Sequence, residues 1–169
     1  MFLRYAFHHM RVLGIDPGFD RNGFGVIEDN GGKLVHIAHG VLQTSKDDIF
    51  MTRLRQVRDN VASLIEQYKP DAVAVEKLFF QTNAKTAINV GMARGVVLLA
   101  IADAGMALVE PTPNQVKQGT AGHGSADKKQ VQEMVKRLLK LEVIPKPDDA
   151  ADALAIAIVG STMVRTVHP

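Results

Sequence analysis

Four acidic residues of this chain occupy positions that ordinary structural roles explain poorly. Asp16 ends the apolar run VLGI and precedes a Pro-Gly turn, Glu76 ends the apolar run DAVAV, and Asp149 and Asp152 lie three residues apart in DDAADALAIAI. A turn aspartate or a helix-capping aspartate is common, so Asp16 and Asp149 each have a simple alternative explanation. Neither explanation covers Glu76 or Asp152, because an unpaired buried carboxylate costs several kcal/mol or shifts its pKa.

Divalent cations would satisfy all four carboxylates together. The chain contains no cysteine and no HxxxH pair, so the available ligands are hard oxygen donors, which favour Mg²⁺ or Mn²⁺ over Zn²⁺. Asp149 and Asp152 can serve one site because residues three apart project from the same face of a helix. Two such ions, roughly 3.5–4 Å apart, can activate a water molecule and stabilise the leaving oxygen of a phosphodiester.

The strands that must position these residues are indicated by short β-prone runs. Residues 11–15 and 23–27, followed by an Asn-Gly turn and the run KLVHIAHGVLQT, predict three consecutive antiparallel strands. The nearly all-apolar run DAVAVEKLF predicts a strand buried on both faces, and this strand should lie parallel to its partner because it follows a crossover helix. ALVEP predicts one more short strand.

Four segments have the periodicity or length of helices. Apolar residues at spacings of three and four predict an amphipathic helix over 50–68, for which Ser45, Asp47 or Asp48 is the expected cap. The pattern also predicts an amphipathic helix with basic outer faces over 128–141 and a buried alanine-rich helix over 148–160. The stretch between 111 and 127 is rich in turn residues and predicts no regular element.

The helix predicted over 82–104 carries a band of small residues formed by Ala87, Gly91 and Gly95. Glycine costs helix stability, so its presence suggests that another element approaches closely. That element is either a second subunit or the sheet of the same chain.

The order βββ-α-β-α-β-α-α predicts an α/β fold with a mixed five-stranded sheet, its first three strands antiparallel, flanked by helices. Of the 169 residues, we expect 10–162 to form a single domain, 1–9 to be a disordered or non-native N-terminal extension, and 163–169 to be a C-terminal tail. No apolar run reaches the ~18 residues of a membrane span, so we expect no membrane association and a cytoplasmic location.

Charge is distributed unevenly along the chain. Residues 111–146 hold seven Lys or Arg against three Asp or Glu, whereas the remainder holds 13 basic and 15 acidic residues. A basic segment beside an acidic remainder suits a polyanionic partner with carboxylates reserved for metal ions. A solvated charged helix face explains the same charges equally well.

Five segments together resemble the RuvC family of Holliday-junction resolvases, nucleases of the RNase H-like (retroviral integrase) superfamily. They are GIDPG at 14–18, VEKLFFQTN at 75–83, GMARGV at 91–96, VKQGTAGHGSADKKQVQEMV at 116–135 and DDAADALAIAI at 148–158. The resemblance runs from about residue 11 to 160 and implies an RNase H-like fold. His123 departs from the hydrophobic residue expected at its position, so we assign it no catalytic role.

The resemblance also implies a role for particular residues. The four carboxylates fall on the family's catalytic, metal-binding positions, which would hold two Mg²⁺ per subunit, with Mn²⁺ as a substitute. Two lysines match basic positions that contact the DNA backbone or the scissile phosphate, Lys128 being also a catalytic position, and two aromatic residues match the position that stacks on a base opened at the junction. The implied site residues are Asp16, Glu76, Asp149, Asp152, Lys117, Lys128, Phe79 and, less closely matched, Phe80.

The activity implied by the resemblance is a structure-selective endonuclease of DNA recombination and DNA repair. It would resolve four-way junctions by paired symmetric nicks that leave a 5'-phosphate and a 3'-hydroxyl. A homodimer is implied because a junction has two strands to cut, with helix 82–104 as the expected interface, and the RuvAB branch-migration complex is an expected partner.

Three alternatives compete with this interpretation. Actin-like ATPases also carry GIDxG, but they need two such domains around a nucleotide and this chain holds one. Another RNase H-like nuclease, acting on RNA-DNA hybrids or transposon ends, would need the same four acids, so only segments 75–83 and 116–135 argue against it. A junction-binding module with an inactive site is disfavoured because all four carboxylates are present.

Overall fold

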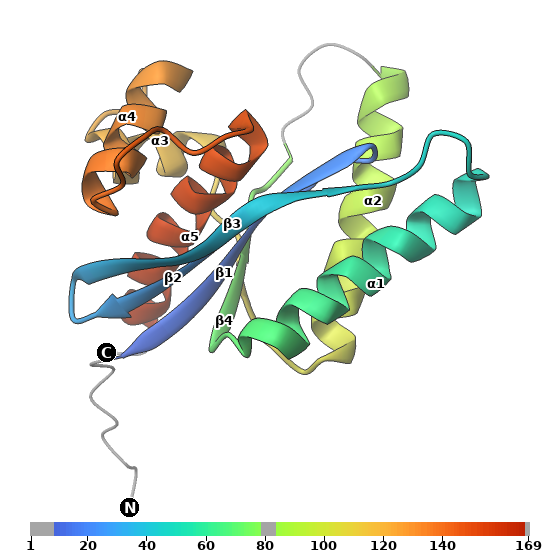
Figure 1. Ribbon diagram of the computed structural model, residues 1–169, viewed down its shortest axis with the longest axis horizontal. Coiled ribbons are helices and arrows are strands. Elements are labelled where there is room, and N and C mark those ends of the chain that lie inside the picture. The colour runs from blue at the N-terminus through green and yellow to red at the C-terminus, as the bar shows by residue number, and fades with distance from the viewer. Residues whose placement is uncertain (1–8, 79–83, 168–169) are drawn as a thin grey trace, which may run out of the picture.

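A five-stranded sheet forms the centre of the molecule (Figure 1), as seen in a computed structural model that describes residues 9–78 and 84–167. The strand order is β3-β2-β1-β4-β5. The first three strands are antiparallel, whereas β4 lies parallel to β1 and β5 parallel to β4. The predicted mixed sheet is therefore confirmed. The strands are β1 (Met10–Asp16), β2 (Arg21–Asn30), β3 (Lys33–Gln43), β4 (Ala72–Val75) and β5 (Ala107–Val109).

Helices cover both faces of the sheet. Helices α1 and α2 pack on one face, while α5 lies on the other face with α3 and α4 beyond it (Figure 1). Each face has its own apolar core, one centred on Leu13, Val73 and Val97 and the other on Val12, Val135 and Leu154. The helices are α1 (Phe50–Tyr68), α2 (Ala84–Asp103), α3 (Pro113–Ala121), α4 (Lys128–Leu138) and α5 (Asp148–Val167). Among the described residues, no helix is both long enough and apolar enough to cross a membrane.

Helix α3 was not predicted from the sequence, because its segment looks like a loop by composition. A capping box begins it: the Thr112 hydroxyl accepts from the Gln115 backbone N–H, and the Gln115 side chain accepts from the Thr112 N–H. Such reciprocal bonds satisfy N–H groups that the first turn of a helix leaves free. Gly122, with a φ of 85°, ends the helix in the left-handed conformation that favours glycine.

The expected caps of α1 are wrong. The N-cap residue is Ile49, and it makes no side-chain capping bond. Asp48 instead accepts a hydrogen bond from the Gln56 side chain at 2.6 Å, and the Ser45 hydroxyl accepts from the Asp47 backbone N–H. These polar residues organise the connection before the helix rather than its first turn.

Helix α5 extends to Val167, into the segment expected as a C-terminal tail. Val164 is buried, and the Arg165 guanidinium lies 3.0 Å from the fully buried carboxylate of Asp29 on β2. The second carboxylate oxygen of Asp29 accepts from the Gly32 backbone N–H at 2.7 Å. A buried carboxylate needs such partners, so the last turns of α5 are fixed to the β2–β3 hairpin.

Candidate active site

Strand pairing brings the first two carboxylates together. Asp16 is the last residue of β1, where it pairs with Gly23 of β2. On its other side β1 runs parallel to β4, with Ile15 beside Val75, so Glu76 follows at the same end of the sheet. The backbone beyond β4 is held in place, because the Lys77 N–H donates to the Pro111 carbonyl at 2.9 Å and the Arg94 guanidinium donates to the Glu76 carbonyl at 3.2 Å.

Glycines in the β1–β2 hairpin allow α5 to approach the sheet very closely. A Cβ atom at Gly14 would lie 2.2 Å from the Ala153 carbonyl oxygen, and one at Gly23 would lie 2.0 Å from the Asp149 carbonyl oxygen. No side chain fits at such distances. Because Gly23 is the strand partner of Asp16, this contact puts the first two turns of α5, with Asp149 and Asp152, beside Asp16.

Two short helices supply the lysines. Lys117 lies on α3, and Lys128 is the first residue of α4, which begins with a second capping box between Asp127 and Gln130. These helices form one wall of a cavity of about 250 Å³ whose polar lining consists of Asp16, Glu76, Lys117, Lys128 and Asp152. The structure therefore brings together five of the residues predicted for the site.

Cations already pair with the carboxylates of α5. The Lys128 ammonium lies 3.1 Å from Asp152 and 3.6 Å from Asp148. Asp149 is paired with Arg21, at 2.9 Å between Nη2 and Oδ2. Arg21 was not predicted as a site residue, since nothing in its neighbourhood marks it except its place five residues after Asp16.

Burial and mutual repulsion set the protonation of the cavity. The pKa of Asp16 rises from 3.8 to about 7, first because it is buried and then because Asp152, Glu76 and Asp149 are negative, an effect that Lys128 partly offsets. Burial also raises the pKa of Glu76, with Asp152 adding to the rise and Lys117 opposing it. The pKa of Asp152 is raised by burial although Lys128 lowers it.

This electrostatic environment suits a divalent cation. Like charges that raise one another's pKa are relieved by a positive ion, and the donors are all carboxylate oxygens, which Mg²⁺ and Mn²⁺ prefer. Within residues 9–78 and 84–167, however, no three acidic or histidine side chains are arranged as they would be around a metal ion. Asp149 is paired with Arg21 and does not line the cavity, whereas Asp152 lines it and is paired with Lys128. The donor set thus fits a metal, and Asp149 and Asp152 would exchange these ion pairs for the cation.

The remaining predicted site residues fall elsewhere. Phe79 and Phe80 lie outside the described residues, so their stacking role stays a prediction. His123 lies between α3 and α4, where its ring is 3.1 Å from the Ser125 hydroxyl. It lines a different cavity with Lys129 and Glu133.

The mixed sheet with strand order β3-β2-β1-β4-β5 carries carboxylates at the end of β1 and just after the adjacent parallel strand β4, and the final helix adds others. This combination of sheet and carboxylates defines the RNase H-like class of nucleases. Residues 12–160 match the sequence profile of the family described as "Crossover junction endodeoxyribonuclease RuvC". The chain belongs to this RuvC family, whose members are metal-dependent nucleases.

Individual relatives agree over nearly the whole chain. The RuvC protein of Thermosipho melanesiensis is 53% identical over 148 residues, covering 88% of this chain and 94% of its own. That of Roseiflexus sp. (strain RS-1) is 53% identical over 161 residues, covering 94% of this chain and 96% of its own. Thermus thermophilus RuvC, solved in complex with a Holliday junction substrate, superposes with a TM-score of 0.88 at 38% identity, covering 94% of this chain and 97% of the other.

Proposed function

We propose that this chain resolves Holliday junctions by metal-dependent phosphodiester hydrolysis at the cavity formed by Asp16, Glu76 and Asp152. The observation that carries the proposal is the meeting of these carboxylates with Lys117 and Lys128 around one cavity. The structure of Thermus thermophilus RuvC with a Holliday junction supports a four-way junction as substrate.

Each side chain has a distinct role in this proposal. Asp16, Glu76, Asp149 and Asp152 would hold two Mg²⁺ ions, with Mn²⁺ as a possible substitute. When bound, such ions polarise the scissile phosphate and activate water. Asp16 must lose its proton to act as a ligand, which its raised pKa opposes until the cation binds.

The lysines act on the phosphate rather than on the metal. Lys128, whose ammonium lies 3.1 Å from Asp152, would contact the scissile phosphate. Lys117, which lines the same cavity from α3, would contact the DNA backbone. Phe79 and Phe80 would stack on a base opened at the branch point. The products are a 5'-phosphate and a 3'-hydroxyl.

A second copy of the chain completes the proposed assembly. The exposed face of α2 presents Ile88, Met92 and Leu99, whose side chains are 58%, 47% and 55% exposed. Apart from the adjacent backbone of α2 itself, no heavy atom of the described residues lies within 4 Å of a Cβ placed at Gly91 or Gly95, so the sheet does not account for these glycines. We propose that this face forms the two-fold interface of a homodimer that acts with RuvAB in the cytoplasm.

Cleavage of a synthetic mobile four-way junction tests the function. It would be compared with linear duplex and RNA-DNA hybrid, in Mg²⁺, in Mn²⁺ and in EDTA. We expect paired symmetric nicks in the junction alone and only with metal. Metal-dependent cutting of the hybrid instead would keep the site and replace the substrate.

The Asp16→Asn variant is the matched control for this experiment, because it removes a ligand oxygen charge without changing size. It should abolish cleavage while junction binding, measured by gel shift, is retained or strengthened by the loss of one negative charge. Cleavage at the wild-type rate would remove Asp16 from the mechanism.

A further inference from the structure

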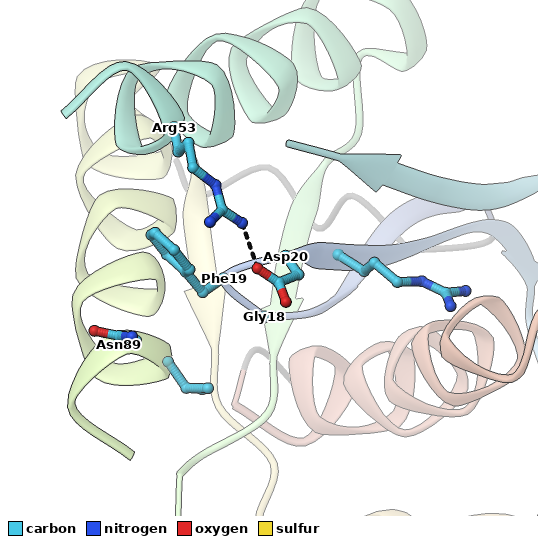
Figure 2. A pocket seen from close by; sticks show the side chains of 7 residues that line it. Gly18, Phe19, Asp20, Arg53 and Asn89 are labelled. Atoms are coloured by element: carbon cyan, nitrogen blue, oxygen red, sulfur yellow. Dashed lines mark hydrogen bonds and ion pairs between the residues drawn. The ribbon is translucent and has the colours of Figure 1, made fainter. Parts of the chain in front are cut away.

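A second cavity, of about 540 Å³, lies against the turn that joins β1 to β2. Its lining comes from the turn, from α1 and from α2: Gly18, Phe19, Asp20, Arg21, Arg53, Asn89 and Val90 (Figure 2). Both of its arginines are already paired, Arg53 with Asp20 and Arg21 with Asp149. Charge therefore does not mark this cavity as an anion site, and the contacts of Arg53 have a different meaning.

Arg53 reaches from the first turn of α1 to the β1–β2 turn, two to four residues beyond Asp16. Its guanidinium forms an ion pair with Asp20, shown as the dashed line in Figure 2, and lies 4.1 Å from the centre of the Phe19 ring. Phe19 also stacks on Phe50, the first residue of α1, at 5.1 Å between ring centroids. The Arg53 side chain is only 11% exposed.

Thr44, in the segment after β3, links Arg53 to the turn by a defined chain of hydrogen bonds. The Thr44 hydroxyl accepts from Arg53 at 3.0 Å (Nε) and 2.9 Å (Nη2), and it donates to the Phe19 carbonyl at 3.0 Å. Arginine can only donate, so Arg53 directs the hydroxyl proton toward Phe19. The Thr44 backbone N–H also donates to the Asp20 carbonyl at 3.1 Å.

We propose that Arg53 is a positioning residue for the active site: through Thr44, Phe19 and Asp20 it fixes the turn whose two ends carry Asp16 and Arg21. This inference rests on the proposed function, because it assigns Asp16 as a metal ligand. The turn is short, so its displacement moves both residues. Asp16 then changes its direction within the cavity, and Arg21 changes its distance from Asp149.

A site of this kind is sensitive to small displacements. A shift of about 1 Å in a reacting group can cost roughly 100-fold in rate, and loss of a residue that supports a metal ligand typically weakens metal affinity about 10- to 100-fold. Removing Arg53 should therefore weaken metal binding and slow the chemical step, whereas the DNA contacts of Lys117 and Lys128 remain.

The test compares Arg53→Met with Arg58→Met, an exposed arginine of the same helix whose ion pair is with its neighbour Asp59. Three quantities are measured for each protein. Mn²⁺ affinity is measured by calorimetry, the cleavage rate is measured in single turnover at saturating enzyme, and junction affinity is measured in EDTA. For Arg53→Met we expect Mn²⁺ affinity about 10-fold weaker, cleavage roughly 10- to 100-fold slower and junction affinity unchanged. Arg58→Met should match the wild type in all three.

A second pair of variants separates positioning from folding. Thr44→Val keeps the volume and removes the hydroxyl, whereas Thr44→Ser keeps the hydroxyl. Only Thr44→Val should reproduce the Mn²⁺ defect, in protein shown to be folded by circular dichroism. If Arg53→Met or Thr44→Val lowers the melting temperature but leaves Mn²⁺ affinity at the wild-type value, the proposal is overturned. Failure of the wild type to cut junctions would instead count against the proposed function, since Mn²⁺ binding needs no cleavage.

Discussion

Asp16 is the residue at which burial and function conflict most. Without metal, its pKa of about 7 means that the native carboxyl keeps a proton which the unfolded chain has already lost near pH 4. The native state therefore binds more protons than the unfolded state between about pH 4 and pH 7, and stability falls as pH rises through that window. A pKa difference of this size corresponds to a loss on the order of 4 kcal/mol.

This conflict gives a measurable pH dependence. In EDTA, the melting temperature of the wild type should fall relative to that of Asp16→Asn as pH rises from about 5 to about 8. His36 and His39 have lowered pKa values, so their contribution makes stability rise with pH. Both proteins contain these histidines, so the comparison between them cancels this contribution. Mg²⁺ should restore the wild type at the higher pH. If the melting temperatures of the two proteins changed with pH in the same way over the whole range, the pKa of Asp16 would not be raised.

Lys128 carries a second prediction at this scale. Burial lowers the pKa of Lys128, but a hydrogen bond to Asp152 and attraction to Asp152, Asp148 and Asp149 together raise it overall, so Lys128 stays charged. Lys128→Ala should slow cleavage on the order of 100-fold, as does the loss of a positioned donor at a reacting oxygen. It should also reduce the slope of log binding constant against log salt concentration by about one, the value for one lost phosphate contact. Lys117→Ala should have the same effect on this slope.

The control for this prediction is Lys129→Ala, because Lys129 follows directly on α4 but lines the cavity near His123. Rates are compared in single-turnover assays, and binding is measured over a series of salt concentrations. An equal loss of activity in Lys128→Ala and Lys129→Ala would indicate a general charge effect of the helix rather than a specific contact.

At the scale of elements, the site depends on how closely α5 packs on the first hairpin. A methyl group at Gly14 would meet the Ala153 carbonyl oxygen at 2.2 Å and the Ala157 nitrogen at 2.6 Å, and both are backbone atoms that cannot turn away. Gly14→Ala should therefore destabilise the fold by about 1–3 kcal/mol. It should also slow cleavage, because the added methyl group would push α5 away from the hairpin and so move Asp149 and Asp152 away from Asp16.

Gly40→Ala on β3 is the matched change, since its methyl group would meet only the edge of the Phe24 ring, a side chain that can shift. It should cost less stability and leave cleavage intact. Both effects are measured by urea unfolding and by junction cleavage. Similar losses in the two variants would mean that the contact of α5 with Gly14 is not special.

These glycines show where prediction from sequence succeeded and where it failed. Alternation and apolar runs predicted all five strands. Glu76 and Asp152 were singled out because a structural role explains them poorly, and Asp16 and Asp149 joined them because one metal site would satisfy all four. The metal-binding role of the four stays a prediction. The predicted close approach at Gly91 and Gly95 was expected to come from a second subunit or from the sheet. The described structure leaves open space there, which argues against the sheet and leaves the subunit a prediction, whereas close approach within the chain occurs at Gly14 and Gly23. A glycine in the sequence shows that a side chain is absent, but it does not show which element occupies the space. Tertiary packing decides that, and the local sequence does not encode it.

The lysines and Arg21 illustrate a second limit. Lys117 and Lys128 were assigned by resemblance. The helix that presents Lys117 was missed because the segment 111–127 around it is rich in Pro, Gly and other turn residues, although its Thr-Pro-x-Gln start is a recognisable capping signal. The pairing of Arg21 with Asp149 joins residues far apart in sequence. No local pattern encodes such a contact, because it depends on where α5 meets the hairpin.

At the scale of the whole molecule, the proposed cutting of two junction strands needs two active sites, because each chain has one. In the proposed dimer the second copy would pack on the exposed face of α2, where Gly95 lies between Met92 and Leu99. Gly95→Glu adds a charge where the single chain has space, so the monomer should fold normally. A buried charge at a two-fold interface faces its own copy and costs several kcal/mol, so the dimer should dissociate.

Sedimentation and a cruciform-bearing supercoiled plasmid together test this interface. Wild-type protein should sediment as a dimer and produce linear plasmid, because both nicks are made within one complex. Gly95→Glu should sediment as a monomer and produce nicked circles, since the two cuts become independent events. Val143→Glu, which adds the same charge at an exposed apolar residue between α4 and α5, should behave as the wild type. A Gly95→Glu protein that stays dimeric and yields linear product would place the interface elsewhere, because a charge buried at this position could not leave both association and paired cutting intact.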